Sequence, residues 1–261
     1  MSPKLPASPS AKADRLAKLS RIASMADVLN YAGPRPDGRD GKGPYGARMS
    51  DALAMLFARA LRDDFPGILP RQDGTGGESR ARTAKGFKKL DVNYSTPELG
   101  LALGVSIKTV NYRDPGTKRY TKNYSRVDNE LRAEAMDYHE RQPYSVLACV
   151  LYLPYDACDD AGVAKGEEAG ISSFGAAVRY FRNRIPRSEP HDVPDLFERF
   201  FIGLYETDGP RRGTAAYYDV ARPRPPRAGR PDASQVIRFE DVIREIRSTY
   251  DDRNNPPFDW S

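Results

Sequence analysis

Three residues in the middle of the chain have types and spacing that could support chemistry on a bound phosphate group. Asp91 lies in the segment KKLDVNYS, and Ser106 and Lys108 lie in the longer apolar segment LALGVSIKTVNY. A carboxylate can hold a hard divalent cation such as Mg²⁺. A lysine ammonium can stabilise negative charge that develops on a phosphate, or orient an attacking water. Together these residue types predict a metal-assisted hydrolytic site.

The two segments are expected to form an antiparallel hairpin, because the STPELG between them carries the Pro and Gly of a turn. With the turn centred near residue 98, Asp91 lies opposite about residue 105. Ser106 and Lys108 point to one face of their strand, because side chains alternate. An ammonium in an apolar run is costly unless it is paired or used. The hairpin thus predicts that a carboxylate, a hydroxyl and an ammonium converge at one sheet edge.

This arrangement resembles the PD-(D/E)xK nuclease superfamily, whose members have the restriction-endonuclease-like fold. The resemblance rests on Lys89-Leu90-Asp91-Val92 and Gly104-Val105-Ser106-Ile107-Lys108-Thr109, and it covers roughly residues 48–155. Two positions depart from the family pattern. Leu90 replaces a proline, and Ser106 replaces the acidic residue that usually stands two positions before the lysine.

The missing carboxylate must come from elsewhere if the site is to hold a metal ion. Glu78, in the upstream loop, is the first candidate, and Glu130 and Glu134 on the following helix are the second. The resemblance implies that Asp91 and Glu78 are ligands of Mg²⁺, for which Mn²⁺ can substitute. It also implies that Lys108 lies beside the scissile phosphate and that the hydroxyl of residue 106 lines the metal pocket.

Basic residues surround the motif. Between residues 80 and 126 there are 11 Lys or Arg and three acids, and the whole chain has a formal charge of +5. This distribution favours a polyanionic partner. The residues expected to contact DNA are Lys88, Lys89, Arg113, Lys118, Arg119, Lys122 and Arg126.

Other residue types narrow the classes of protein that need to be considered. The chain has only two cysteines and two histidines. These numbers argue against a disulfide scaffold, a histidine metal site and Ser-His-Asp hydrolysis. No apolar run approaches the length of a membrane span, and the N-terminus has no apolar signal core. We therefore expect a cytoplasmic protein with no membrane partner.

The remaining pattern predicts an α/β fold: a restriction-endonuclease-like mixed sheet flanked by helices, with an α-rich C-terminal part. An N-terminal helical and loop segment (1–47) precedes a nuclease-like core (48–220). A Pro/Arg linker and a last helix (221–261) follow the core. Besides the hairpin, strands are expected over 145–153 and 214–220. Helices are expected over 13–31, 50–63, 125–141, 174–184, 195–206 and 239–250.

The chain is accordingly interpreted as a Mg²⁺-dependent endonuclease that cuts double-stranded DNA, in a type II restriction or antiviral defence system. Its products would be 5′-phosphate and 3′-hydroxyl ends, as the resemblance implies. A homodimer is a further expectation, because a two-fold protein matches a palindromic site. Two alternatives stay open: a catalytically inactive nucleic-acid-binding module of the same fold, which Ser106 favours, and an RNA-cleaving nuclease.

Overall fold

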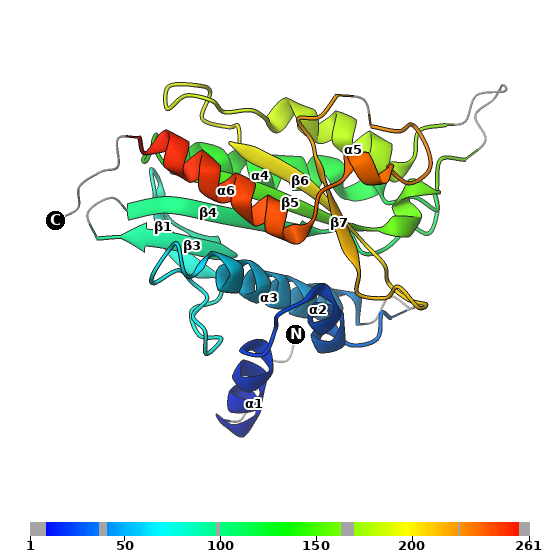
Figure 1. Ribbon diagram of the computed structural model, residues 1–261, viewed down its shortest axis with the longest axis horizontal. Coiled ribbons are helices and arrows are strands. Elements are labelled where there is room, and N and C mark those ends of the chain that lie inside the picture. The colour runs from blue at the N-terminus through cyan, green and yellow to red at the C-terminus, as the bar shows by residue number, and fades with distance from the viewer. Residues whose placement is uncertain (1–8, 37–40, 98–99, 163–169, 224, 256–261) are drawn as a thin grey trace.

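A five-stranded mixed β-sheet forms the centre of the molecule (Figure 1). The structure is a computed structural model that describes residues 9–36, 41–97, 100–162, 170–223 and 225–255. The strand order is β3-β4-β5-β6-β7; the three middle strands are parallel, and each edge strand is antiparallel to its neighbour. The strands are β3 Val92–Thr96, β4 Gly100–Thr109, β5 Val146–Pro154, β6 Arg199–Tyr205 and β7 Ala215–Asp219.

The side chains of the middle strand, β5, are apolar on both faces of the sheet and must be buried on both. All nine of its residues are buried, and it pairs in parallel with β4 on one side and β6 on the other. Parallel neighbours need crossover connections, which here contain helices α4 (Tyr124–His139) and α5 (Ser173–Phe181). The strand expected over residues 145–153 is confirmed, and its continuous apolar sequence reflects burial on both faces.

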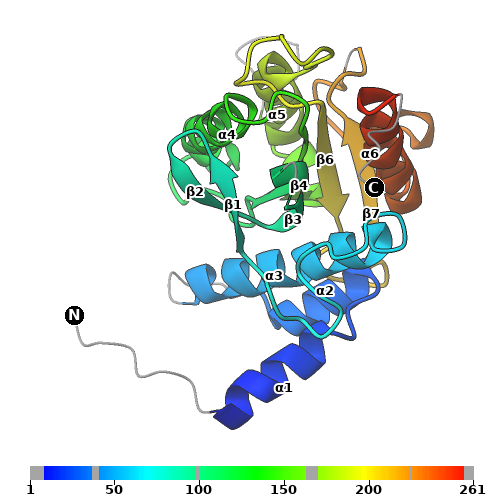
Figure 2. The same ribbon diagram turned by 90° about the vertical axis from the view of Figure 1, so that its left-hand side faces the viewer.

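Helices cover the sheet in two layers (Figure 2). α3 and α6 share an apolar core with one face, and α4 and α5 share a second core with the opposite face. The segments outside residues 48–220 also contribute buried side chains, such as Leu29 and Ile246, to the first core. The helices are α1 Pro9–Leu19, α2 Met25–Ala32, α3 Lys42–Leu61, α4 Tyr124–His139, α5 Ser173–Phe181 and α6 Phe239–Arg253. The predicted α/β class with a mixed sheet and flanking helices is therefore confirmed.

β3 and β4 form the predicted antiparallel hairpin with a small shift in register. Val92, not Asp91, pairs with Val105, because an irregularity between Tyr94 and Ser95 shifts the pairing by one residue. The predicted turn centre near residue 98 lies outside the described residues. Val105 and Ile107 belong to the core under α3, so the alternation of the strand turns Ser106 and Lys108 towards α4.

A separate two-stranded ribbon precedes the hairpin and was not expected. β1 Ser79–Thr83 and β2 Gly86–Leu90 are antiparallel, with Ser79 opposite Leu90 at the base and Thr83 opposite Gly86 at the tip. The segment KKLDVNYS is therefore two strands, β2 and β3, rather than one. The break between them falls at Asp91.

The predicted helix over residues 195–206 is wrong, because this segment contains strand β6. Six of the seven residues of β6 are buried, so its apolar run is continuous and does not alternate. A short apolar run of this kind fits a buried strand and one face of a helix equally well.

The N-terminal predictions also need correction. The single helix expected over residues 13–31 is two helices, and Ser24 caps the second by accepting a hydrogen bond from the N–H of Asp27 at 3.2 Å. The helix expected over residues 50–63 begins earlier, at Lys42, so the N-terminal segment 1–47 already contains the first turns of α3. Within the described ranges, no helix is long and apolar enough to cross a lipid bilayer.

The close packing of β6 on β5 gives a stability prediction for Gly203→Ala. A Cβ at Gly203 would come within 2.7 Å of the buried ring of Tyr152, whose hydroxyl is hydrogen-bonded to that of Tyr217 at 2.9 Å. We expect the substitution to cost about 1–3 kcal/mol of unfolding free energy, measured by denaturant melts. Gly43→Ala is the control, since nothing lies within 4 Å of its Cβ position. Equal stability of the two variants would contradict this account of the sheet.

Candidate functional site

Asp91 lies at the open edge of β4, between the ribbon and the sheet. The pairing of β3 with β4 ends where Val92 lies opposite Val105. Beyond Val105, the edge of β4 that faces away from β5 has no strand beside it among the described residues. The Asp91 carboxylate takes the place of a strand there, accepting a hydrogen bond from the N–H of Ile107 at 2.7 Å. Burial raises the pKa of Asp91 from 3.8 to about 6, against the opposing effects of this N–H and of Lys108.

The Lys108 ammonium lies beneath α4. Its Nζ is 3.2 Å from Oε2 of Glu134, which is itself buried. Burial alone would lower the pKa of Lys108, but the carboxylates of Glu134 and Asp91 outweigh it and raise that pKa above its ordinary value. The ammonium therefore stays protonated across the physiological pH range.

Two small side chains complete the surroundings of this ammonium. Ser106 is 1% exposed, and its Oγ has no hydrogen-bond partner. Cys149 pairs with Ser106 across the β4–β5 ladder, and burial raises the pKa of its thiol well above the ordinary value. The thiol is thus a neutral group rather than a nucleophile. The Ser106 hydroxyl is a buried polar group without a protein partner among the described residues.

Glu78 lies at the base of the ribbon, directly before β1. Because Ser79 pairs with Leu90, the residues that flank the ribbon, Glu78 and Asp91, meet at one place. The Glu78 side chain is exposed and is 2.5 Å from Lys89 Nζ, and its backbone has a left-handed φ of 47°. That conformation is uncommon for a residue other than glycine and costs about 1 kcal/mol or more.

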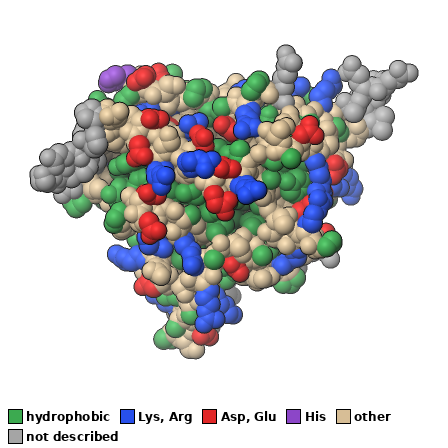
Figure 3. All heavy atoms as spheres, in the orientation of Figure 1, with side chains coloured by type: hydrophobic (Ala, Val, Ile, Leu, Met, Phe, Trp, Pro, Cys, Tyr) green, Lys and Arg blue, Asp and Glu red, His purple; other side chains and the backbone are tan. Residues whose placement is uncertain are grey.

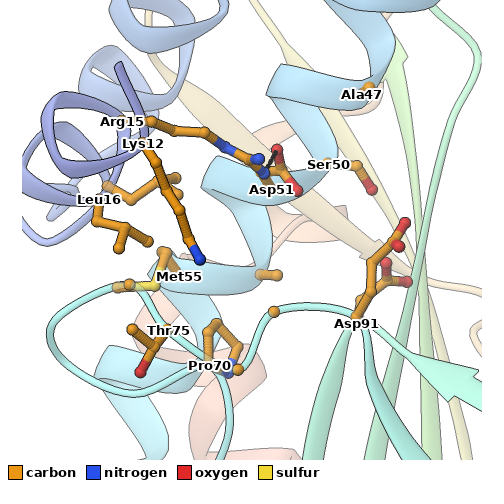
Figure 4. Close-up of a pocket in the computed structure, with 16 residues that line it drawn as sticks. Lys12, Arg15, Leu16, Ala47, Ser50, Asp51, Met55, Pro70, Thr75 and Asp91 are labelled. Atoms are coloured by element: carbon orange, nitrogen blue, oxygen red, sulfur yellow. Dashed lines mark hydrogen bonds and ion pairs between the residues drawn. The ribbon is translucent and has the colours of Figure 1, made fainter. Parts of the chain in front are cut away.

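A pocket of about 430 Å³ separates these two carboxylates from α3. Figure 4 shows Ser50 and Asp51 of α3 across this pocket from Asp91. Asp51 is bound to Arg15 at 2.7 Å, and burial raises the pKa of its carboxyl group. The sequence analysis missed Asp51; the available signal was an acid within the apolar stretch MSDALAML.

Lys108 opens onto a different hollow. A groove of about 710 Å³ along α4 is lined by Lys108, Glu130 and Glu134, whereas Asp91 and Glu78 line the pocket against α3. Glu130 is exposed and ion-paired to Arg126 at 2.5 Å. Of the two candidate glutamates on α4, Glu134 is therefore the one that meets the lysine. The open edge of β4 separates the two hollows.

Carboxylates are the ligands in this site that suit a hard cation such as Mg²⁺. Within the described part of the chain, no group of three or more His, Cys, Asp or Glu side chains is arranged to hold a metal ion. Mg²⁺ commonly takes only one or two carboxylates and completes its shell with water and substrate phosphate. The pair formed by Asp91 and Glu78 fits that smaller requirement.

The cations expected to contact DNA are mostly in ion pairs with acids of the chain. Lys118 is exposed, and Arg119 donates to the carbonyl oxygen of Ile171. Ion pairs with both partners exposed contribute about 0–1 kcal/mol, so a phosphate can replace the carboxylate of Glu78, Asp156 or Glu130 at little cost. Lys88 instead lies on the inner side of the ribbon, opposite the buried Ala81, where it is held by Asp137. The pairs are Lys88–Asp137, Lys89–Glu78, Arg113–Asp156, Lys122–Asp114 and Arg126–Glu130.

Comparisons with known proteins add no relative to this geometry. No family model matches the chain, and neither a curated protein nor a solved structure is significantly similar to it.

The raised pKa of Asp91 predicts how Asp91→Asn changes stability with pH. A carboxyl group with a pKa of about 6 in the fold and about 3.8 when unfolded stabilises the protein below pH 3.8, and this contribution is lost as the pH rises through 6. Without metal at pH 8, Asp91→Asn should be more stable than the parent by about 3 kcal/mol. Below pH 4 the difference should vanish. Denaturant melts in EDTA measure both values, and a less stable variant at pH 8 would contradict the burial of this charge.

Proposed function

We propose that the protein is a metal-dependent endonuclease of the PD-(D/E)xK type that hydrolyses phosphodiester bonds in double-stranded DNA. The observation that carries the proposal is that Asp91 and Lys108 flank the same end of β4, close enough to influence each other's pKa although their side chains line different hollows. Both are ionisable groups held in largely buried positions, where each influences the pKa of the other. Perturbed ionisable groups in a cleft are the usual mark of a functional site.

Asp91 and Glu78 are the residues that would hold Mg²⁺ or Mn²⁺. They come from the two ends of the ribbon and line one pocket. The bound cation would neutralise charge on the phosphate and make water a better nucleophile. Lys89 already neutralises Glu78, so DNA phosphates that draw Lys89 away would free Glu78 for the cation.

Lys108 acts in this proposal through its charge. Its raised pKa keeps it protonated, so it stabilises negative charge on the scissile phosphate rather than accepting a proton from water. Glu134, on α4, holds the ammonium of Lys108 in position through their ion pair. Ser106 contributes a neutral hydroxyl where the family pattern has a carboxylate, and Glu78 supplies the missing charge.

The biological setting follows from the same proposal. A cutter of duplex DNA in a restriction or antiviral defence system would act in the cytoplasm as a homodimer on a palindromic site. Two free, buried cysteines suit a reducing compartment.

A second candidate function is a DNA-binding module that has lost the chemistry. The observation that favours it is the Lys108–Glu134 ion pair, together with the lack of a three-ligand metal cluster among the described side chains. In such a protein the ammonium would serve only to fix α4 on β4. The two candidates differ in whether Mg²⁺ binds and whether DNA is cut.

Lys108→Met tests the role of the ammonium. Plasmid nicking in Mg²⁺ should fall by about 100-fold or more, because an electrostatic stabiliser of the transition state is removed. Duplex binding in EDTA should be unchanged. Since the substitution leaves Glu134 without its partner, the double variant Lys108→Met/Glu134→Gln serves as the folded control. Parental nicking by that double variant would remove Lys108 from the site.

Glu78→Gln and Glu130→Gln test the source of the second carboxylate. Glu78→Gln should weaken Mn²⁺ binding by calorimetry and slow nicking at least about 10-fold, because Mg²⁺ and Mn²⁺ prefer carboxylate oxygens. Glu130→Gln is the matched control, since Glu130 pairs with Arg126 and lies in the other hollow. Parental metal binding and nicking by Glu78→Gln would exclude that residue as a ligand.

A further inference from the structure

The β1–β2 ribbon has an outer face of unusual composition. The alternation of the two strands turns Ala81, Thr83 and Leu90 inward, where they are buried. The outward residues are exposed, and they comprise three cations and one aromatic ring: Arg80, Arg82, Phe87 and Lys89. None of the four outward positions within the ribbon is acidic.

The composition of this outer face does not stabilise the fold of the ribbon. Arg80 lies directly opposite Lys89, and like charges in that position destabilise a strand pair. Phe87 is 63% exposed, with the Arg82 guanidinium 5.8 Å from its ring centroid. An exposed phenylalanine beside closely spaced cations suits a ligand with both phosphates and flat apolar surfaces.

The ribbon is a rigid platform, because α4 anchors its inner side. Lys88 is ion-paired to Asp137 at 2.8 Å, and the Tyr138 hydroxyl donates to the carbonyl oxygen of Lys88 at 2.8 Å. At the tip, the N–H of Ala84 donates to the carbonyl oxygen of Asp137 at 2.9 Å. The outer face is therefore presented to solvent in one orientation.

The platform leads directly into the candidate site. Glu78 precedes its first strand and Asp91 follows its second, and the Ser79–Leu90 pair holds these ends together. Phe87 is four residues before Asp91, which is about 13 Å along an extended strand. A DNA duplex lying on the ribbon would thus pass within about four base pairs of the carboxylates.

We propose that the outer face of the β1–β2 ribbon binds duplex DNA beside the cleavage site, which deepens the proposed function and rests on it. Arg80, Arg82 and Lys89 contact phosphates, and Phe87 packs against a sugar or base edge. The major groove of B-DNA is about 12 Å wide and admits a two-stranded ribbon, whereas the deep, narrow major groove of A-form RNA does not.

Three substitutions separate the charged contacts from the apolar one. Binding of a short duplex is measured in EDTA at several salt concentrations. Arg80→Gln and Arg82→Gln should each weaken binding about 5- to 10-fold and lower the slope of log K against log salt by about 1. Phe87→Ser should weaken binding about 10-fold and leave the slope unchanged, because no phosphate contact is lost. Melting temperatures should stay near the parental value, since all three side chains are exposed.

Arg244→Gln on α6 is the matched control, with a side chain that is 62% exposed and ion-paired to Asp241. The face around α6 has Lys and Arg interspersed with Asp and Glu (Figure 3), so it presents no continuous basic surface. This variant should bind DNA as the parent does. If the ribbon variants also bind like the parent while the parent binds with a steep salt dependence, the ribbon proposal is overturned and the proposed function stands.

The remaining outcomes are equally distinct. A parent that does not bind duplex DNA at any salt concentration overturns both the ribbon proposal and the proposed substrate. If Phe87→Ser loses affinity for single strands but not for duplex, the ring stacks on unpaired bases and the assignment to duplex DNA is wrong. Equal losses on duplex RNA would likewise contradict a B-form partner.

Discussion

The half-buried ammonium of Lys108 is the constraint on which the rest of the candidate site depends. Lys108 stands in the core strand β4, where an unpaired charge would be costly, and it is tolerated because Glu134 and Asp91 lie near it. Glu134 requires α4 to cross that end of β4, and Asp91 requires the chain to leave the ribbon at the open strand edge. The same three charges that stabilise one another form the centre of the proposed active site.

The sheet topology explains why this centre is accessible. β4 pairs with β5 from Leu103 to Thr109, but with β3 only from Gly100 to Val105. The edge of β4 beyond Val105 is therefore open on the side of β3, and the Asp91 carboxylate binds the N–H of Ile107 there. Helix α3 stands off this edge far enough to leave a pocket, whereas the central strands are sealed by helices on both faces.

Elements with local signals could be predicted from the sequence, whereas contacts between residues far apart in the chain could not. The hairpin, α4 and the doubly buried β5 could be predicted, because turn residues, helical spacing and a continuous apolar run are local signals. β6 could not be told from a helix, since both its faces are buried. Asp51 faces Asp91 across the pocket because α3 packs beside a strand edge forty positions further along the chain. The preference for Glu134 over Glu130 depends on a rotation of α4 that its weak amphipathicity does not define.

The clamped base of the ribbon has an evolutionary consequence. Because the Ser79–Leu90 pair fixes where the ribbon begins and ends, insertions or deletions of residue pairs nearer the tip would leave Glu78 and Asp91 in place. The two-residue loop formed by Ala84 and Lys85 is a position where the length of the ribbon can change in this way. If the proposed function holds, the length and outer residues of the ribbon could change without moving the carboxylates at its base, so that specificity and catalysis would evolve separately.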